Sequence, residues 1–487
     1  MLKQIINAKP LLIICFFFLS SAHLTVRAAT AEKPNIIFVL FDDLGYGQPA
    51  CYRDATEFKT PNMDRLAKEG MRFTDAHSAS SVCTPTRYGV LTGRYPSRIG
   101  QYGVLTTFSK PIIPTTRLTV PTLLKQHGYD TACIGKWHLG MDWGSTPTGK
   151  ESSVPVGTRL VLSPTALGFD LFYGYTHARN FGMLIEQDRV ESNVEDVETQ
   201  PRLAKKVVAF LEDPARTNKP FFLYLPLCPP HTPIVPAAEF AGKGSLNGKD
   251  GAYGDWLYQG DWVLGQVLQA LDRRQLSDNT LIMVSSDNGA AGRVYEPLRG
   301  CKTSIYEGGH RVPFLARWPG KIKAGSVCDD TICLNDLIAT CAEIVNAKLP
   351  DNAGEDSVSI LPDLLDTAKA PVREAIIHQD YKGSLAIRQG PWKLIFFKDG
   401  KRELYNLQND LSETKDIAEA NSDIVKRLTT LMHRVIAEGR STVGAPQKNE
   451  AEMSVDKASS GGKGNKGKKG NKNAKEEVAL AKDPSFD

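Results

Sequence analysis

Short, almost wholly apolar runs alternate with amphipathic stretches up to about residue 350. The runs at 35–41, 221–227 and 281–284 contain β-branched or aromatic residues throughout, which is typical of strands buried on both faces of a sheet. Between them, 62–69 and 254–271 space their apolar residues as helices do. The alternation predicts an α/β fold in which helices flank a large, mixed or parallel β-sheet.

The pattern changes after about residue 350. Residues 386–397 and 403–407 are typical of a short antiparallel sheet, and 416–438 has the spacing of an amphipathic helix. We therefore expect two domains, a large α/β domain at 29–350 and a smaller α+β domain with a short antiparallel sheet at 351–445.

The N-terminus has the pattern of a secretory signal peptide at 1–28. Lys3 and Lys9 precede an apolar run at 11–19 that is too short to span a bilayer, and small residues follow. The signal peptide predicts export, and the absence of an Asn-x-Ser/Thr sequon favours a bacterial periplasmic or extracellular protein. An uncleaved anchor is the alternative. No later stretch reaches the ~20 apolar residues of a membrane span, so we expect no transmembrane span in the mature protein.

The C-terminal tail at 446–487 is basic and of low complexity. Six lysines and no acidic residue lie at 461–475, and without them the formal charge of the chain changes from +4 to −2. The near-neutral remainder gives no reason to expect a nucleic-acid partner. The composition predicts a disordered tail, with a tether for a polyanion as the alternative.

Eight cysteines remain once the signal peptide is removed, and their spacing is irregular. The sequence has no C-x-x-C pair, which argues against a structural zinc site or a redox motif. One or two disulfides stay open as alternatives in an exported protein.

Acidic residues follow two of the predicted buried strands. Asp42 and Asp43 come at the end of the first strand, and Asp287 and Asn288 follow the strand at 281–284. Open α/β sheets bind ligands at the carboxyl ends of their strands, and hard oxygen ligands suit Ca²⁺ or Mg²⁺. The pair of sites predicts a metal centre, with helix capping by each aspartate as the alternative.

A lone cysteine precedes a predicted helix in a loop rich in Ser, Thr and Pro. Thr84 and Pro85 favour a helix start, so a helix to about Leu91 would put Cys83 at the positive end of the helix dipole. Arg87 lies one turn later and can bind an oxyanion with its forked guanidinium. The segment predicts an anion-binding site with Cys83 as a nucleophile at its entrance. A buried or disulfide-bonded structural cysteine is the alternative.

Residues 83–87 (Cys-Thr-Pro-Thr-Arg) and 91–94 (Leu-Thr-Gly-Arg) together resemble the C-x-P-x-R-x-x-x-L-T-G-R signature of the type I sulfatases, which include arylsulfatase A and N-acetylgalactosamine-6-sulfatase. The resemblance implies an alkaline-phosphatase-like fold and the hydrolysis of sulfate esters to an alcohol and inorganic sulfate. It also implies a partner, the formylglycine-generating enzyme, which oxidises Cys83 to formylglycine. The hydrate of that aldehyde would be the nucleophile.

Further motifs extend the resemblance over roughly 34–440. Residues 135–140 resemble the second sulfatase signature, 230–233 resemble its proline-flanked histidine, and 388–393 resemble its C-terminal domain. Cys301, directly before Lys302, departs from the expected pattern. The implied catalytic residues are Cys83, Arg87, Lys136, His138, His231 and Lys302. The implied metal ligands are Asp42, Asp43, Cys83, Asp287 and Asn288, usually for Ca²⁺, with Mg²⁺ as the alternative.

The resemblance also implies a catalytic role for each of these residues. Arg87 and the two lysines would offset charge on the sulfate oxygens. His231 or Lys302 would protonate the leaving oxygen, Asp287 would act as a base, and His138 would take the proton that allows the aldehyde to reform.

The substrate is inferred from location. Export and the basic tail favour a sulfated polysaccharide or a glycosaminoglycan-like sugar, and His177 and Arg179, within 173–189, are candidate contacts. Two alternatives stay open. One is a phosphatase or phosphonate hydrolase of the same superfamily, although those enzymes usually offer Ser or Thr as nucleophile. The other is a non-catalytic protein that binds sulfated glycans.

Overall fold

The computed structural model describes residues 33–145, 147, 154–217 and 219–456. The expected signal peptide and the part of the predicted 446–487 tail beyond residue 456 lie outside these ranges. The prediction of disorder is wrong for 446–456, because Met453 and Val455 are buried in the same core as the C-terminal strands. Within the described ranges, no helix is long and apolar enough to cross a membrane. No disulfide joins any two of the eight cysteines within these ranges, so the one or two disulfides that the sequence left open are not present among them.

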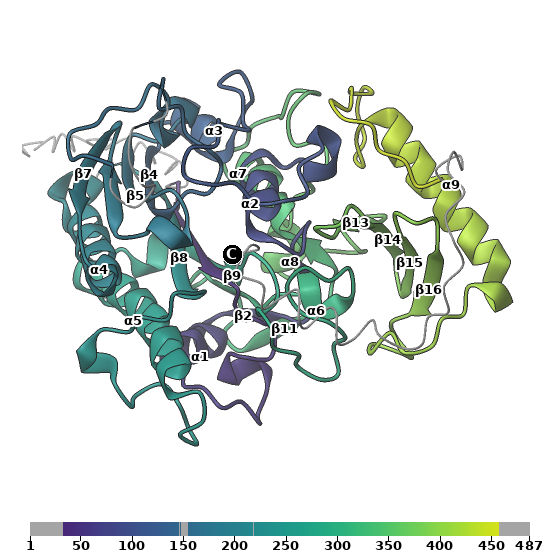
Figure 1. Ribbon diagram of the computed structural model, residues 1–487, viewed down its shortest axis with the longest axis horizontal. Coiled ribbons are helices and arrows are strands. Elements are labelled where there is room, and N and C mark those ends of the chain that lie inside the picture. Colours follow the sequence, from purple (N-terminus) through teal and green to yellow (C-terminus); the bar gives the residue numbers. More distant parts are fainter. Residues whose placement is uncertain (1–32, 146, 148–153, 218, 457–487) are drawn as a thin grey trace, which may run out of the picture. The chain divides into compact units, whose positions relative to one another are not determined.

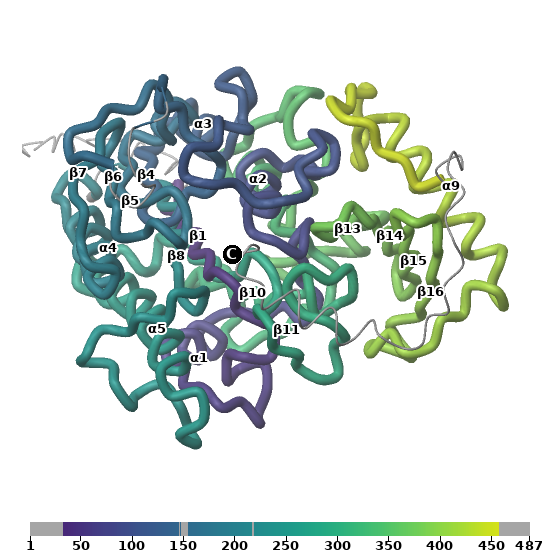
Figure 2. Tube along the Cα trace, in the orientation of Figure 1, coloured from purple at the N-terminus to yellow at the C-terminus, as the bar shows by residue number. Residues whose placement is uncertain are grey.

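A ten-stranded mixed sheet organises the first part of the described chain (Figure 1). Its central strand is β1 (Asn35–Asp42), which runs parallel to β8 (Phe221–Pro230) on one side and to β9 (Thr280–Ser286) on the other. All three are buried along their whole length, as their apolar composition predicts. Figure 2 shows β1 beside β8, although the two are far apart in the sequence. The order across the sheet is β11 (Ser326–Cys328), β2 (Met71–Phe73), β10 (Phe314–Arg317), β9, β1, β8, β4 (Asp130–Lys136), β5 (Leu171–Tyr175), β6 (Met183–Glu186) and β7 (Arg189–Asn193).

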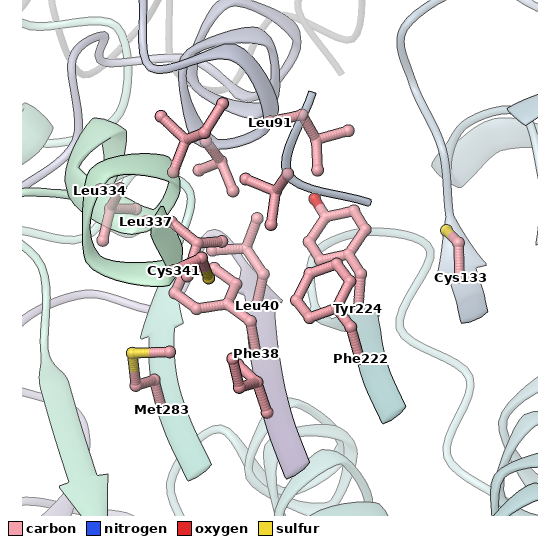
Figure 3. Close-up of a cluster of buried hydrophobic side chains, with 14 of the residues drawn as sticks. Phe38, Leu40, Leu91, Cys133, Phe222, Tyr224, Met283, Leu334, Leu337 and Cys341 are labelled. Carbon is pink, nitrogen blue, oxygen red and sulfur yellow. The ribbon is translucent and has the colours of Figure 1, made fainter. Parts of the chain in front are cut away.

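Each face of this sheet has its own hydrophobic core, because successive side chains point to opposite faces. Phe38 and Leu40 of β1 belong to one core, in which Figure 3 shows them with Leu337. Ile37 and Val39 belong to the other. The first core includes side chains of α2 (Cys83–Thr92), α3 (Val120–Gln126) and α7 (Leu337–Ile344). The second includes side chains of α1 (Pro61–Glu69), α4 (Asp196–Glu212) and α5 (Gly251–Arg273). The helices predicted at 62–69 and 254–271 are thus confirmed.

The C-terminal part of the described chain contains a four-stranded antiparallel sheet, as expected. Its strands, in order, are β13 (Ile376–Gln379), β14 (Leu385–Gln389), β15 (Trp392–Phe396) and β16 (Arg402–Asn406). Leu428, Met432 and Val435 of α9 (Ser422–Glu438) pack into the same core as this sheet. Shorter elements are β3 (Ala76–His77), β12 (Ile332–Cys333), α6 (Glu307–His310) and α8 (Leu361–Leu364).

The sequence placed the start of the last helix at Asp416, which is wrong, since α9 begins at Ser422. The Asp416 carboxylate instead accepts hydrogen bonds from the backbone amides of Leu404 and Ala418, both at 3.0 Å. An aspartate that accepts backbone amides in this way stabilises a turn rather than a helix interior.

Strand β13 joins the C-terminal sheet to the segment that leads into α2. The Gln379 amide donates to the Ala79 carbonyl at 3.1 Å, and the Ser81 amide donates to the Gln379 carbonyl at 3.1 Å. The residues that directly precede Cys83 are therefore held by the C-terminal sheet, and the Ser81 carbonyl also accepts from the Thr303 amide at 2.9 Å.

Candidate active site

Carboxylates and an amide meet at the carboxyl ends of β1 and β9. Asp42 is the last residue of β1, and Asp287 directly follows β9, the parallel neighbour of β1. The Asp43 amide donates to Asp287 Oδ1 at 3.2 Å, and Asn288 Nδ2 donates to Asp43 Oδ1 at 2.6 Å. Strand pairing thus brings these four candidate metal ligands together.

Two oxygen atoms in this group have no hydrogen-bond partner among the described residues. They are Asp42 Oδ1 and Asn288 Oδ1, both buried, and of the two Asp42 Oδ1 forms an ion pair, with Arg87 Nη2 at 3.5 Å. An orphaned buried oxygen is unfavourable unless something else binds it. Ligand atoms of Asp42, Asp287 and Cys83 also lie within 4.8 Å of one another. Because carboxylate and amide oxygens are the ligands that Ca²⁺ and Mg²⁺ prefer, the residues fit a hard divalent cation.

Helix α2 directs the cysteine and an arginine toward the same carboxylates. Cys83 is the first residue of α2 and is fully buried. One turn later, Arg87 donates to Asp287 Oδ2 through Nη2 at 2.7 Å and through Nε at 3.1 Å. Its Nη1 donates to the Lys136 carbonyl at 3.2 Å. The guanidinium therefore connects the start of α2 with the ends of β9 and β4.

Two buried lysines pair with the carboxylates that follow β1. Lys136, at the end of β4, places Nζ 2.5 Å from Asp42 Oδ2. Lys302 Nζ lies 3.0 Å from Asp43 Oδ2 and 3.3 Å from His231 Nε2. Burial alone would raise the pKa of Asp42, but the charge of Lys136 and the other nearby cations hold that pKa well below its usual value.

The two candidate histidines make different polar contacts. His138 Nε2 lies 2.9 Å from the Leu105 carbonyl, while its Nδ1 is buried without a hydrogen-bond partner among the described residues. His231 donates from Nδ1 to the Thr232 carbonyl at 2.5 Å. Burial lowers the pKa of both rings, and the charge of Lys136 lowers that of His138 further. Both imidazoles are therefore neutral at pH 7.

Of the two candidate substrate contacts within 173–189, His177 lies against a candidate catalytic residue. The His177 ring stacks on His138, with ring centroids 5.7 Å apart and an interplanar angle of 26°. Arg179 is exposed. Sequence reasoning missed Thr84 and Leu105 as parts of the site. The only sequence signal for Thr84 is its position directly after Cys83. Leu105 contributes backbone atoms, which every residue has, so its sequence carries no signal.

A second buried polar cluster joins α6 to the C-terminal sheet, and no motif predicted it. The rings of His310 and His378 stack with centroids 3.8 Å apart, and His77 Nδ1 lies 3.1 Å from His310 Nδ1. The charged groups that pair around these rings are Arg311, Arg388, Lys393, Asp75, Glu307 and Glu413. Because cations and carboxylates are equal in number and two rings are stacked, the cluster fits a charge-balanced bridge better than a cation site.

Comparison with known proteins agrees with this geometry. Residues 34–347 match the sulfatase family, and residues 301–440 match the C-terminal region of N-sulphoglucosamine sulphohydrolase. The chain is 32% identical over 484 residues to the N-acetylgalactosamine-6-O-sulfatase of Bacteroides thetaiotaomicron, which covers 83% of this chain and 93% of that protein. It is 34% identical over 415 residues to human arylsulfatase A, covering 77% of each chain.

The fold also matches a solved structure. A sulfatase described with the metabolism of multiple glycosaminoglycans by Bacteroides thetaiotaomicron superimposes with a TM-score of 0.74 at 29% identity, and the match covers 83% of this chain and 99% of that one. The large mixed sheet and the C-terminal antiparallel sheet are thus those of the alkaline-phosphatase-like sulfatase fold. The chain belongs to the sulfatase family and is a sulfuric ester hydrolase of the arylsulfatase type.

Proposed function

We propose that this sulfatase is exported and removes sulfate from a sulfated carbohydrate, either a polysaccharide or a glycosaminoglycan-like sugar, through a formylglycine made from Cys83. The observation that carries the proposal is the convergence of Cys83, three buried cations and a set of hard oxygen atoms at the carboxyl ends of the strands. The sugar class is supported by relatives whose names refer to N-acetylgalactosamine and to glycosaminoglycans. Export is supported by the N-terminal sequence pattern.

The environment of Cys83 supports its modification. Burial raises the pKa of the Cys83 thiol to about 11, against the opposing charges of Lys136 and Lys302. A protonated thiol is a poor nucleophile, so the encoded residue would be inert as it stands. Formylglycine would supply a hydrated aldehyde, with one hydroxyl to attack sulfur and a second to release it. Because Cys83 is fully buried, the modifying enzyme must act before this segment folds.

Asp42, Asp43, Asp287 and Asn288, together with residue 83, would hold Ca²⁺, with Mg²⁺ as the alternative. The cation, when bound, supplies Lewis-acid polarisation of the sulfate group. Burial and the charge of Asp42 raise the pKa of Asp287 to about 7. A bound divalent cation would lower this pKa, so Asp287 would be ionised and able to accept a proton at neutral pH.

The buried cations would stabilise the reacting sulfate group. Arg87, Lys136 and Lys302 carry N–H donors in a site closed to water, where charge stabilisation is strongest. The Lys302 ammonium, 3.3 Å from His231 Nε2, would donate the proton to the leaving oxygen directly, or His231 would pass it on after taking it up at Nε2. His138 would accept a proton at Nδ1, since its Nε2 already donates to a carbonyl.

The proposal is tested by incubating the purified full-length protein with sulfated glycosaminoglycan oligosaccharides, 4-nitrophenyl sulfate and 4-nitrophenyl phosphate. We expect sulfate release from an oligosaccharide, measured by ion chromatography, and no phosphate release above that of Cys83→Ala. Turnover of the aryl ester alone would refute the sugar assignment. Faster release of phosphate than of sulfate would favour phosphatase chemistry.

A further inference from the structure

The hydroxyl of Thr84 connects two loops of the candidate active site. Thr84 follows Cys83 in α2 and is fully buried. Its Oγ1 donates to the His138 carbonyl at 2.9 Å and accepts from the Leu105 amide at 3.2 Å. The Leu105 carbonyl in turn lies 2.9 Å from His138 Nε2. Thr84, Leu105 and His138 therefore form a closed ring of three hydrogen bonds, which we call the Thr84 clasp.

The clasp fixes the tautomer of His138. A carbonyl oxygen has only lone pairs, so His138 Nε2 must carry the proton in its contact with Leu105. The lone pair of the neutral ring is then on Nδ1, which is buried and makes no hydrogen bond with any described residue. His138 lies among the charged groups of the candidate site, since Lys136 and Arg87 both lower the pKa of its ring. A buried ring nitrogen with a free lone pair at such a place is in the state that a proton acceptor requires.

The clasp also supports an unfavourable backbone conformation. His138 has φ 58°, a left-handed value that is uncommon for a residue with a side chain. Its amide donates to the Thr176 carbonyl at 2.7 Å, and its carbonyl accepts from Thr84. Without the threonine hydroxyl, this buried carbonyl and the Leu105 amide would lose a partner together.

We propose that Thr84 is a positioning residue, whose hydroxyl holds the Leu105 carbonyl against His138 Nε2 and so presents His138 Nδ1 as the base beside residue 83. The inference rests on the proposed function, in which His138 accepts a proton during turnover. A hydroxyl is required because the clasp needs one atom that both donates and accepts. Serine meets this requirement, whereas valine, which has nearly the shape of threonine, does not.

The tautomer is tested directly by NMR on full-length protein labelled with ¹⁵N-histidine, in which the His138 signal is identified by its loss in His138→Asn. We expect a protonated Nε2 and an unprotonated Nδ1 in the wild type and in Thr84→Ser. In Thr84→Val we expect a mixture of tautomers. The matched control is Thr92→Val, which removes a buried hydroxyl from the same helix that bonds only to the Tyr88 carbonyl. It should leave the His138 tautomer unchanged.

Kinetics test the consequence for turnover. Rates are expressed per molecule with formylglycine at position 83, counted by mass spectrometry, because Thr84 lies in the segment that the modifying enzyme would recognise. We expect Thr84→Val to lower kcat about tenfold or more with KM little changed, since general base catalysis depends on the correct protonation state. Thr84→Ser should restore most of the rate. If Thr84→Val does not fold, Thr84→Ala takes its place.

The outcomes separate this inference from the proposed function. A single, unchanged His138 tautomer in Thr84→Val, or an unchanged kcat, would overturn the role of Thr84 even if the wild type is an active sulfatase. An inactive wild type without formylglycine would refute the proposed function, while the tautomer measurement, which needs no turnover, would still decide whether the clasp exists.

Discussion

The ammonium group of Lys393, in the C-terminal sheet, lies 3.0 Å from the carboxylate of Glu307, at the start of α6. Both side chains are fully buried. The same ammonium lies 2.7 Å from Glu413. Because Glu307 follows Lys302 closely in the chain, this pair ties the C-terminal sheet to the loop that carries a candidate sulfate-binding lysine.

Replacing Lys393 by methionine would leave the buried Glu307 and Glu413 carboxylates without the ammonium group that they share. We expect Lys393→Met to lower the free energy of unfolding by about 3–5 kcal/mol, the usual effect of breaking a buried ion pair. Urea denaturation measures this change. Lys398→Met, in an exposed position on the turn between β15 and β16, should change the free energy by less than about 0.5 kcal/mol. Equal stability of the two variants would show that the buried pair does not connect the two sheets.

The three clustered histidines predict a loss of stability in mild acid. Burial lowers the pKa of His77, and burial with neighbouring charge holds those of His310 and His378 well below their usual value. Below about pH 6.5 the unfolded chain therefore binds protons that the folded protein does not. The free energy of unfolding should fall as pH falls, by about 1.4 kcal/mol per pH unit for each histidine that stays neutral.

Urea denaturation at several values between pH 7.5 and pH 5.5 checks this slope. His378→Gln should make the slope shallower, because one of the three groups no longer takes up a proton on unfolding. A stability that stays constant across this range would contradict the neutral state of the cluster.

Divalent cations should stabilise the protein through the carboxylates at the ends of β1 and β9. After treatment with EDTA, adding Ca²⁺ should raise Tm, with a gain of about 2.7 kcal/mol at a concentration one hundred times Kd. Asn288→Leu, which removes one of the two orphaned oxygens, should abolish most of this shift. Asp399→Asn, on an exposed turn, should retain it. A shift that survives in Asn288→Leu would place the cation elsewhere.

Substitutions of Cys83 show whether turnover requires formylglycine at this position or only a nucleophilic side chain. Cys83→Ala should abolish turnover, because no nucleophile remains. Cys83→Ser keeps one hydroxyl but cannot supply the second, so we expect no repeated turnover in a sulfate-release assay. Cys328→Ser, at a half-buried position outside the candidate site, should retain activity. Sustained turnover by Cys83→Ser would contradict the need for an aldehyde hydrate.

The sequence predicted those strands and helices whose burial follows directly from their amino-acid composition. β1 and β8 are almost wholly apolar, and this pattern is sufficient to identify a strand buried on both faces. β13 was not predicted because it is short and ends in His378 and Gln379. Those polar side chains are buried only because the segment before Cys83 and the histidine cluster lie against them, which depends on the tertiary fold.

The candidate site was predictable as a set of residues but not as a set of contacts. Motif order indicated Cys83, Lys136 and Lys302 without any knowledge of the fold. The pairing of Arg87 with Asp287 and the support that the Leu105 carbonyl gives to a histidine could not be predicted. Both join distant parts of the chain, and the second uses a backbone atom that carries no signal in the sequence.

The most direct test is the mass of the peptide that contains residue 83, taken from full-length protein purified from its native host. We predict a loss of about 18 Da relative to the cysteine peptide, equal to the conversion of the thiol to an aldehyde. That result would establish the nucleophile on which the proposed function depends. An unmodified thiol in protein that nevertheless releases sulfate, or a disulfide at Cys83, would contradict it.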